Sequence, residues 1–175
     1  MTNAHLTRRG FMGTTALAGA SLSLPHAVHA RTSPEGDSFR YEVERSDADW
    51  RERLSPEEYE ILRNGGTEFP TTSPFWDDYT SGAFACRGCD LPLYVSEYRA
   101  QIEMGFVFFH HSRPNAVLTD IDYSDAYGMG TDGTRAMIEV HCRRCGSHLG
   151  HIVVVEDAQV HCINGTSLTF EAARA

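Results

Sequence analysis

Lysine is absent from this 175-residue sequence, so all 15 basic side chains are arginines. Chemistry that depends on a lysine amine, such as Schiff-base formation, is therefore excluded. Cations are also outnumbered, since the formal net charge is −9 and the isoelectric point is about 5.4. An acidic chain offers no basic footprint for DNA or RNA, and we expect no nucleic-acid partner.

Long hydrophobic runs are missing as well. Residues 1–30 contain no Asp or Glu, and their apolar stretch, residues 13–24, is too short and too rich in small residues to span a bilayer. We therefore expect no stable membrane insertion. Residues 7–12 read Thr-Arg-Arg-Gly-Phe-Met, which matches the twin-arginine export pattern, and residues 28–30 provide small side chains for a cleavage site. We predict that residues 1–30 are a twin-arginine signal peptide and that the protein is exported to a bacterial periplasm.

The remainder of the chain is long enough for one domain with a hydrophobic core. Hydrophobic residues form 41% and charged residues 22% of the sequence, as in ordinary globular proteins. Residues 31–47 are polar, and we expect them to form an extended lead-in to a folded domain at residues 48–172.

Short segments indicate the secondary structure of that domain. Residues 55–58 read Ser-Pro-Glu-Glu, a capping box with proline at the first helical position, so a short helix should begin there and stop at glycines 65–66. Short strands bounded by turn residues are expected at 83–85, 93–95, 106–109, 137–140, 152–155, 160–163 and 168–170. These strands follow one another too closely for crossover helices, which predicts antiparallel sheets. Residues 115–134 are rich in Asp, Gly and Tyr and should form a mobile surface loop.

Four of the five cysteines occur as two Cys-x-x-Cys pairs, Cys86 with Cys89 and Cys142 with Cys145. Two intervening residues allow a tight turn to point both sulfurs at one place, and two such turns complete a tetrahedron of thiolates. Gly88 and Gly146 should permit the backbone geometry of these turns. A closed shell of four thiolates leaves no position for a substrate, so we predict one structural Zn2+ per chain.

Two other interpretations of these pairs remain open. Two disulfides would suit an exported protein, which meets an oxidising compartment. One pair could instead be a redox centre of the thioredoxin type, although neither pair opens a helix after a strand.

Cys162 is the cysteine left over, and it is either a functional thiol or a buried, inert one. His148 and His151 follow the second cysteine pair directly, and Asn164 lies two residues after Cys162, on the same face if the strand continues. A neighbouring imidazole can lower the pKa of a thiol and supply a proton. We therefore take Cys162, His148, His151 and Asn164 as candidate catalytic residues. The two histidines could alternatively begin a second metal site, but no further ligand cluster is evident.

Several short motifs follow one another between residues 45 and 170. They read Gly-Thr-Glu at 66–68, Gly-Ala-Phe-Ala-Cys at 82–86, Cys-Asp-Leu-Pro-Leu-Tyr at 89–94, Cys-Arg-Arg-Cys-Gly-Ser-His-Leu-Gly-His at 142–151 and Cys-Ile-Asn-Gly at 162–165. In this combination they resemble the methionine-R-sulfoxide reductase family. The resemblance implies a mainly β fold of two antiparallel β-sheets with a short N-terminal helix, with zinc on one side and the active site on the other. Residues 48–172 would then be the catalytic domain.

The resemblance also implies a reaction. The Cys162 thiolate would attack the sulfur of a methionine-R-sulfoxide in an oxidised protein. His148 or His151, helped by Asn164, would stabilise and protonate the departing oxygen. Cys162 would become a sulfenic acid, which a thioredoxin-like protein or a small thiol must then reduce.

The sequence departs from the family pattern around the substrate. Residues 105–109 read Gly-Phe-Val-Phe-Phe where the family has Gly-Trp-Pro-Ser-Phe, so Phe106 takes the place of the tryptophan that binds the substrate methyl group. Met104 occupies the position of the resolving cysteine of many members, and Val160 replaces an arginine after a shortened segment. We therefore expect an enzyme with a single working cysteine. The alternative is a catalytically weakened zinc-binding β-module that binds a peptide, a thiol or a partner protein.

Overall fold

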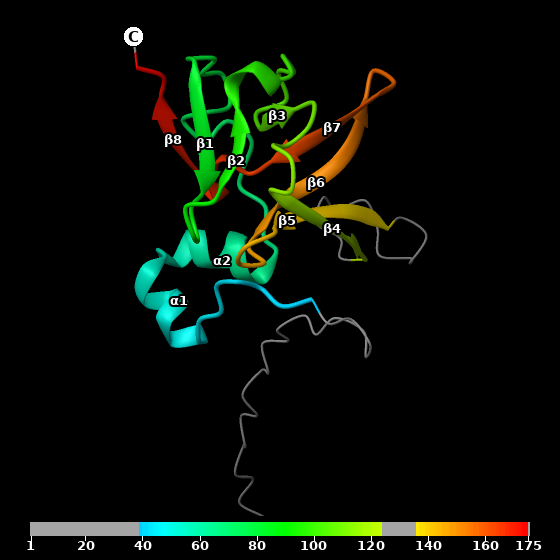
Figure 1. Cartoon of the computed structure of the whole chain (residues 1–175). Coiled ribbons are helices and arrows are strands. Elements are labelled where there is room, and N and C mark those ends of the chain that lie inside the picture. Colours follow the sequence, from blue (N-terminus) through cyan, green and yellow to red (C-terminus); the bar gives the residue numbers. More distant parts are fainter. Residues whose placement is uncertain (1–38, 124–135, 175) are drawn as a thin grey trace, which may run out of the picture. The chain divides into compact units, whose positions relative to one another are not determined.

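The computed structural model describes residues 39–123 and 136–174, which belong to the unit Phe39–Ala175 (Figure 1). The predicted signal peptide and residues 31–38 of the predicted lead-in lie outside the described residues. Within those ranges, no helix is long and apolar enough to cross a membrane.

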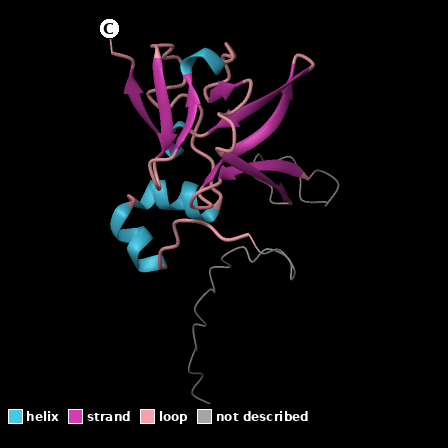
Figure 2. Ribbon diagram, viewed as in Figure 1, coloured by secondary structure: helices cyan, strands magenta, loops and turns pink. Residues whose placement is uncertain are grey.

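The described chain folds into two sheets with two α-helices beside them (Figure 2). The helices are α1 (Asp47–Arg53) and α2 (Pro56–Asn64), and the short 3-10 helices are η1 (Ser96–Tyr98) and η2 (Gly165–Ser167). The strands are β1 (Gly82–Cys86), β2 (Pro92–Val95), β3 (Val107–Phe109), β4 (Val117–Asp122), β5 (Met137–Cys142), β6 (His148–Val155), β7 (Ala158–Ile163) and β8 (Leu168–Ala172).

Both sheets are antiparallel. The smaller has the strand order β2-β1-β8, and the larger has the order β3-β7-β6-β5-β4. Three of the neighbouring pairs, β1 with β2, β5 with β6 and β6 with β7, are joined by short connections, as antiparallel strands allow. The prediction of a mainly β fold with two antiparallel sheets is confirmed.

Helix α2 begins and ends where the sequence predicts. The Ser55 side chain accepts a hydrogen bond from the Glu58 N–H at 3.2 Å, and Pro56 is the first helical residue. Gly65 ends the helix with φ of 73°, a left-handed conformation that glycine adopts at little cost.

Helix α1 is an addition to the predicted fold. Ser46 and Asp49 form a second capping box, so the helix begins at Asp47, inside the segment that was expected to be extended. Trp50 anchors this helix: it is buried, and the guanidinium groups of Arg45 and Arg63 lie 4.8 and 4.5 Å from its ring centroid. The lead-in prediction is therefore wrong at its last residue, because a local capping box starts a helix there.

Aromatic rings join the two sheets. Tyr94 of β2 stacks on Phe109 of β3, with ring centroids 4.1 Å apart, and Phe84 of β1 meets Phe109 edge-on at 5.3 Å. All three side chains are fully buried. Burial of one such ring contributes about 2–3 kcal/mol to folding, so this cluster holds the smaller sheet against the β3 edge of the larger one.

The segment predicted as a loop, residues 115–134, contains strand β4. This strand pairs in register with β5, and Asp122 lies opposite Met137. Because β4 is an edge strand with residues 119–121 exposed, its sequence shows neither a regular alternation nor a continuous apolar run. The loop prediction is wrong for β4, while residues 124–134 lie outside the described part of the chain.

Strands β6 and β7 form a tight hairpin. Their two-residue turn consists of Glu156 and Asp157, with φ of 48° and 65°. Two positive φ values in a two-residue turn match the right-handed twist of the flanking strands. Pairing then runs without interruption from this turn to His151 opposite Cys162, so the turn fixes which residues of the two strands meet.

Candidate active site and metal centre

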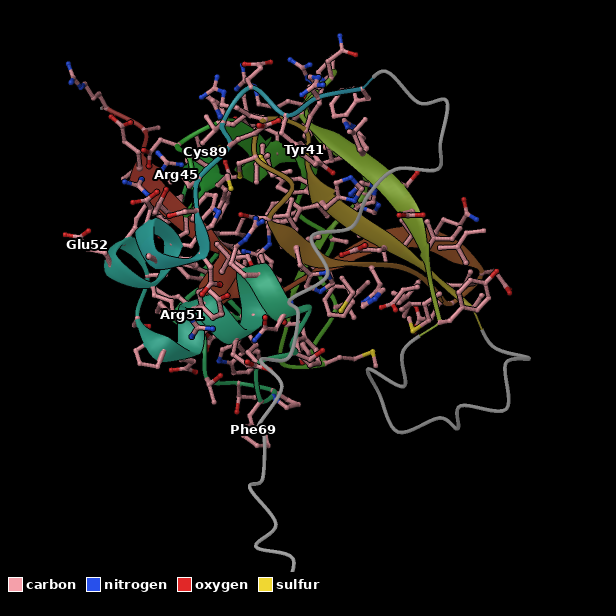
Figure 3. All side chains as sticks on the ribbon, turned by 90° about the horizontal axis from the view of Figure 1, so that it is seen from below. Tyr41, Arg45, Arg51, Glu52, Phe69 and Cys89 are labelled. Atoms are coloured by element: carbon pink, nitrogen blue, oxygen red, sulfur yellow. The ribbon has the colours of Figure 1, made fainter. Side chains whose placement is uncertain are left out.

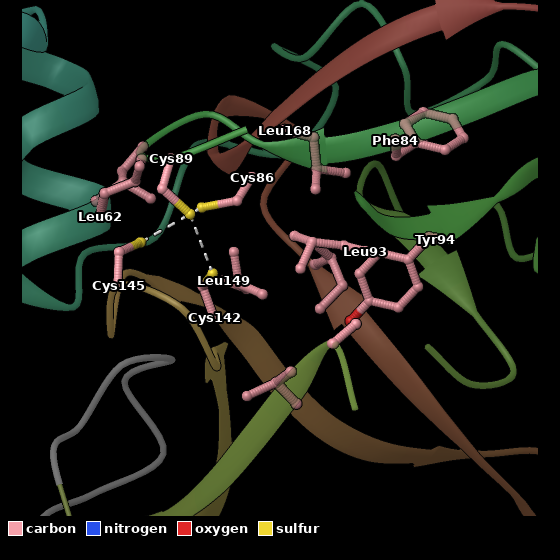
Figure 4. Packing of buried hydrophobic residues seen from close by; sticks show 14 of the residues in the cluster. Leu62, Phe84, Cys86, Cys89, Leu93, Tyr94, Cys142, Cys145, Leu149 and Leu168 are labelled. Carbon is pink, nitrogen blue, oxygen red and sulfur yellow. Dashed lines mark hydrogen bonds between the residues drawn. The ribbon is translucent and has the colours of Figure 1, made fainter. Parts of the chain in front are cut away.

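The four paired cysteines converge on one point (Figure 4). Their Sγ atoms all lie within 4.8 Å of one another, and all four residues are buried. The Sγ atoms of Cys86 and Cys145 are 3.7 Å apart. Those of Cys89 and Cys142 are 3.6 Å apart. Sulfurs around a tetrahedral zinc, each about 2.3 Å from the metal, would be separated by about 3.8 Å, whereas a disulfide requires about 2.05 Å. The spacing fits a metal and excludes the disulfide interpretation for this structure.

The backbone of the two cysteine turns explains their glycines. Gly146 has φ of 68° and donates its N–H to the Cys142 carbonyl at 2.8 Å, so it serves the turn as predicted. Gly88 serves a different purpose, because a Cβ atom there would lie 2.7 Å from Oγ of Ser147. Gly88 therefore allows the two turns to approach each other closely enough for the sulfurs to meet.

The chemistry of the thiols also fits a cation. Hydrogen bonds to Cys142, Cys145 and Cys89, followed by burial, raise the pKa of the Cys86 thiol well above its usual value. Protein alone therefore disfavours four simultaneous thiolates, and a divalent cation would reverse that preference. Three arginines donate to carbonyl oxygens of the turns: Arg53 to Gly88 at 2.9 Å, Arg63 to Cys145 at 3.2 Å and Arg144 to Cys89 at 3.3 Å. The positive charge of these arginines offsets the negative charge of ionised thiols.

Cys162 lies in a row of residues that crosses the larger sheet. In register, Phe108 of β3 is opposite Cys162 of β7, which is opposite His151 of β6, which is opposite Glu139 of β5. Directly opposite residues of antiparallel strands point to the same face, with Cβ atoms about 4.5–5.5 Å apart. The thiol, which is 6% exposed, therefore has an aromatic ring on one side and an imidazole on the other.

The imidazole side of the row is a buried set of acids and histidines. Nε2 of His151 lies 2.8 Å from Oδ2 of Asp122, and Nδ1 of His148 lies 2.6 Å from Oε1 of Glu139. The two imidazole rings meet edge-on with centroids 5.1 Å apart. Each buried imidazole thus lies within hydrogen-bond distance of a buried carboxylate, which orients its ring beside the thiol.

The other side of Cys162 is apolar. Cys162 forms a buried cluster with Ala100, Phe108 and Val160. Phe106 packs against this cluster, so the structure brings the predicted substrate-binding ring to the predicted nucleophile. Val160 is 1% exposed, and its apolar side chain occupies the position where the family resemblance implies an arginine.

Asn164 follows directly after strand β7, which ends at Ile163, and its backbone is still extended. Its catalytic role stays a prediction. Its Oδ1 accepts a hydrogen bond from the Glu68 N–H at 3.1 Å, and its Nδ2 donates to the Leu149 carbonyl at 3.3 Å. The side chain thus binds backbone on two neighbouring segments and positions the chain that follows the nucleophile.

Comparison with known proteins agrees with this geometry. Residues 54–172 match the model of the SelR domain. The chain is a member of the SelR domain family. It is 38% identical over 135 residues to a peptide methionine sulfoxide reductase MsrB of Agrobacterium fabrum, covering 74% of this chain and 93% of that protein. It is 36% identical to peptide methionine sulfoxide reductase B3 of Arabidopsis thaliana, covering 75% and 72%. An MsrB of Thiobacillus denitrificans is 37% identical, covering 72% and 92%.

Two acidic residues of this SelR domain are not singled out by the sequence alone. Glu139 stands among apolar residues of a predicted strand, and a buried acid in such a place is a usable signal for a functional partner. Asp122 gives no comparable signal, because its strand β4 reads as a loop. Among the residues that the structure describes, the four cysteines form the only group of three or more ligands close enough to share a metal. Within this part of the chain, His148 and His151 therefore do not belong to a second metal site.

His161, next to the candidate nucleophile Cys162 in the chain, faces the opposite side of the SelR-domain sheet. Its Nδ1 lies 3.0 Å from the Tyr94 hydroxyl. Burial lowers the pKa of His161, and the charge of nearby His111 lowers it further. Burial also raises the pKa of Tyr94 far above its usual value, so burial favours the neutral form of both partners.

This pair predicts a pH-dependent free energy of unfolding. The pKa of His161 is below its unfolded value of 6.5, so the unfolded chain takes up the proton more readily. The stabilisation is therefore present above about pH 6.5 and is lost as the pH falls, by at most about 1.4 kcal/mol per pH unit. His161→Asn keeps an acceptor for Tyr94 without titrating, and urea unfolding between pH 7.5 and 5.5 should show a shallower decline than in the wild type.

A second variant separates the two causes of the shift. His111→Asn removes only the smaller one, so it should keep most of the decline that His161→Asn abolishes. Identical pH profiles for the wild type and His161→Asn would contradict the assignment of this effect to His161.

Proposed function

We propose that this protein reduces peptide-bound methionine-R-sulfoxide to methionine, with Cys162 as its single nucleophile and an external thiol as the reductant. The observation that carries the proposal is the row across the larger sheet, in which the thiol lies between an apolar cluster and a buried histidine. A methyl sulfoxide needs both environments, because its methyl group is apolar and its oxygen must gain a proton. The names of the SelR-domain relatives, peptide methionine sulfoxide reductases, support the same reaction.

The proposed reaction removes one oxygen atom from the sulfoxide. The Cys162 thiolate attacks the sulfoxide sulfur, and the S–O bond breaks as the oxygen takes up two protons and leaves as water, so that a sulfonium is bonded to the cysteine sulfur. Water then attacks the cysteine sulfur and loses a proton, the S–S bond breaks, methionine leaves, and Cys162 becomes a sulfenic acid. Two equivalents of an external thiol then return the cysteine to the thiol, with release of water and formation of one disulfide. A thioredoxin-like protein or a small thiol has this chemistry.

The residues around Cys162 have distinct parts in this proposal. His151 lies directly opposite the thiol in the β-ladder and is the preferred proton donor, with Asp122 holding its ring through Nε2. His148, held by Glu139, is the second histidine of the pair. Phe106 and the apolar cluster receive the methyl group, and Asn164 acts as a positioning residue.

The single-cysteine mechanism predicts a trappable intermediate. With dithiothreitol as reductant, the wild type should turn over a methionine-R-sulfoxide peptide and Cys162→Ser should not. Substrate added without reductant should leave a sulfenic acid at Cys162, measured by mass spectrometry after dimedone labelling.

Asp122→Asn should lower kcat by about 10- to 100-fold, because the orientation and proton affinity of His151 both depend on that carboxylate.

Two results would argue against this mechanism. A disulfide between Cys162 and one of the paired cysteines would mean that the metal site takes part in the redox cycle. Absence of any oxidation at Cys162 with either sulfoxide epimer would favour the alternative function, a zinc-binding β-module that binds a peptide, a thiol or a partner protein.

We propose that the metal held by the four paired cysteines is one structural Zn2+. The spacing of the sulfurs and the soft thiolate donors favour zinc, and four protein ligands leave no position for substrate. Elemental analysis should give one zinc per chain. Cys89→Ser or a strong chelator should unfold the domain, because both sheets contribute ligands and metal binding is coupled to folding. A metal-free, folded protein would contradict this proposal.

We further propose that the protein is exported to a bacterial periplasm by the twin-arginine route. The paired arginines Arg8 and Arg9 and the small residues before Arg31 support it, and a protein that acquires a metal before export suits a route for folded proteins. The mature N-terminus should be Arg31, and a variant with both arginines replaced by lysines should remain in the cytoplasm as precursor. Normal export of that variant would indicate the general secretory route instead.

A further inference from the structure

The loop between α2 and β1 is fastened to the segment that follows the nucleophile. Glu68, 4% exposed, accepts hydrogen bonds from the N–H groups of Gly165 and Thr166, both at 2.8 Å. Its own N–H donates to the Asn164 side chain at 3.1 Å. Glu68 is thus bound to residues 164–166, which begin two residues after Cys162 in the sequence.

The same loop is fastened a second time, to the segment that precedes β3. The Thr71 N–H donates to the Gly105 carbonyl at 2.8 Å. A Cβ atom at Gly105, which has φ of 82°, would lie 2.8 Å from Cβ of Pro70, so the two backbones are in close contact. Gly105 immediately precedes Phe106, which packs against the Cys162 cluster. These contacts place residues 69–71 next to residues 104–106.

Two large apolar side chains near these attachments are exposed, one on each of the two segments. Phe69 is 82% exposed, the highest value for a large hydrophobic residue in the described part of the chain, and Met104 is 56% exposed. Figure 3 shows Phe69 at the periphery of the molecule. Contact with an apolar partner would remove this side chain from water, which is favourable.

We propose that Phe69 and Met104 form an apolar platform that binds an apolar side chain of the substrate polypeptide, close in sequence to the methionine sulfoxide. The inference rests on the proposed function and adds a substrate preference to it. The platform lies near the candidate active site, because residues 69–71 contact residues 104–106 and Phe106 packs against the Cys162 cluster. An extended peptide advances about 3.3–3.6 Å per residue, so a side chain two or three residues from the sulfoxide can reach this platform. Unfolded, oxidised proteins offer such segments.

Two capped heptapeptides test this preference. Both carry methionine-R-sulfoxide at the centre, and the second and third positions on each side are leucine in one and serine in the other. A contact that buries most of a leucine side chain changes binding by about tenfold. Wild-type protein with zinc and dithiothreitol should therefore show a kcat/KM about tenfold higher for the leucine peptide. Phe69→Ser should reduce this ratio severalfold, and Phe69→Ser with Met104→Ser should bring it close to one.

A matched control and a binding measurement complete the test. Val154→Ser changes a side chain that is 66% exposed on β6, and it should keep the wild-type ratio. Binding of both peptides to Cys162→Ser, with and without Phe69→Ser, is measured by fluorescence anisotropy and does not depend on turnover. If the wild type turns over neither peptide while binding still favours the leucine peptide, the proposed function is wrong and the platform remains supported.

Other outcomes would overturn the platform itself. Equal kcat/KM and equal binding for the two peptides in the wild type would do so, as would a ratio that Phe69→Ser leaves unchanged while turnover is normal. A concentration-dependent dimer in analytical ultracentrifugation that Phe69→Ser abolishes would assign the exposed ring to a second copy of the chain instead.

Discussion

The antiparallel pairing of β6 with β7 sets which side chains can meet Cys162. A slip of one residue in this pairing would put the Cys162 thiol and the His151 side chain on opposite faces of the sheet. Two local structures hold the register: the turn at Glu156 and Asp157 at one end, and the second cysteine turn, which leads directly into β6, at the other. Metal binding, fold and nucleophile are therefore linked through a single β-hairpin.

That hairpin places Cys162 at a boundary between two environments. On one side, Phe106 and Val160 exclude water; on the other, His151 and Asp122 form a buried, hydrogen-bonded pair. Buried charge is costly unless it is paired, and here each of the two buried histidines has its own carboxylate. The arrangement keeps the His151 imidazole directly opposite the thiol while both residues are buried.

Local sequence signals predicted the parts of the fold that depend on neighbours in the chain. The cap at Ser55, the left-handed Gly65 and the convergence of the cysteine pairs all follow from a few consecutive residues. Helix α1 has an equally local cap in Ser46. Its partner three residues later is Asp49, whereas the usual capping box has glutamate or glutamine there, so the sequence signal is weaker. Strand β4 is different, since an exposed edge strand is defined by its partner rather than by its own pattern.

The sequence by itself singled out the four cysteines that converge on one point, the candidate nucleophile Cys162 and the two candidate histidines, because cysteine spacing and an unmatched fifth thiol are visible without a fold. Only the tertiary structure decided that Asp122 serves His151, that Asn164 binds backbone, and that Phe69 stays exposed beside the active site. Each of these depends on segments far apart in the chain, whose register and close approach are fixed by strand pairing and packing rather than by neighbouring residues.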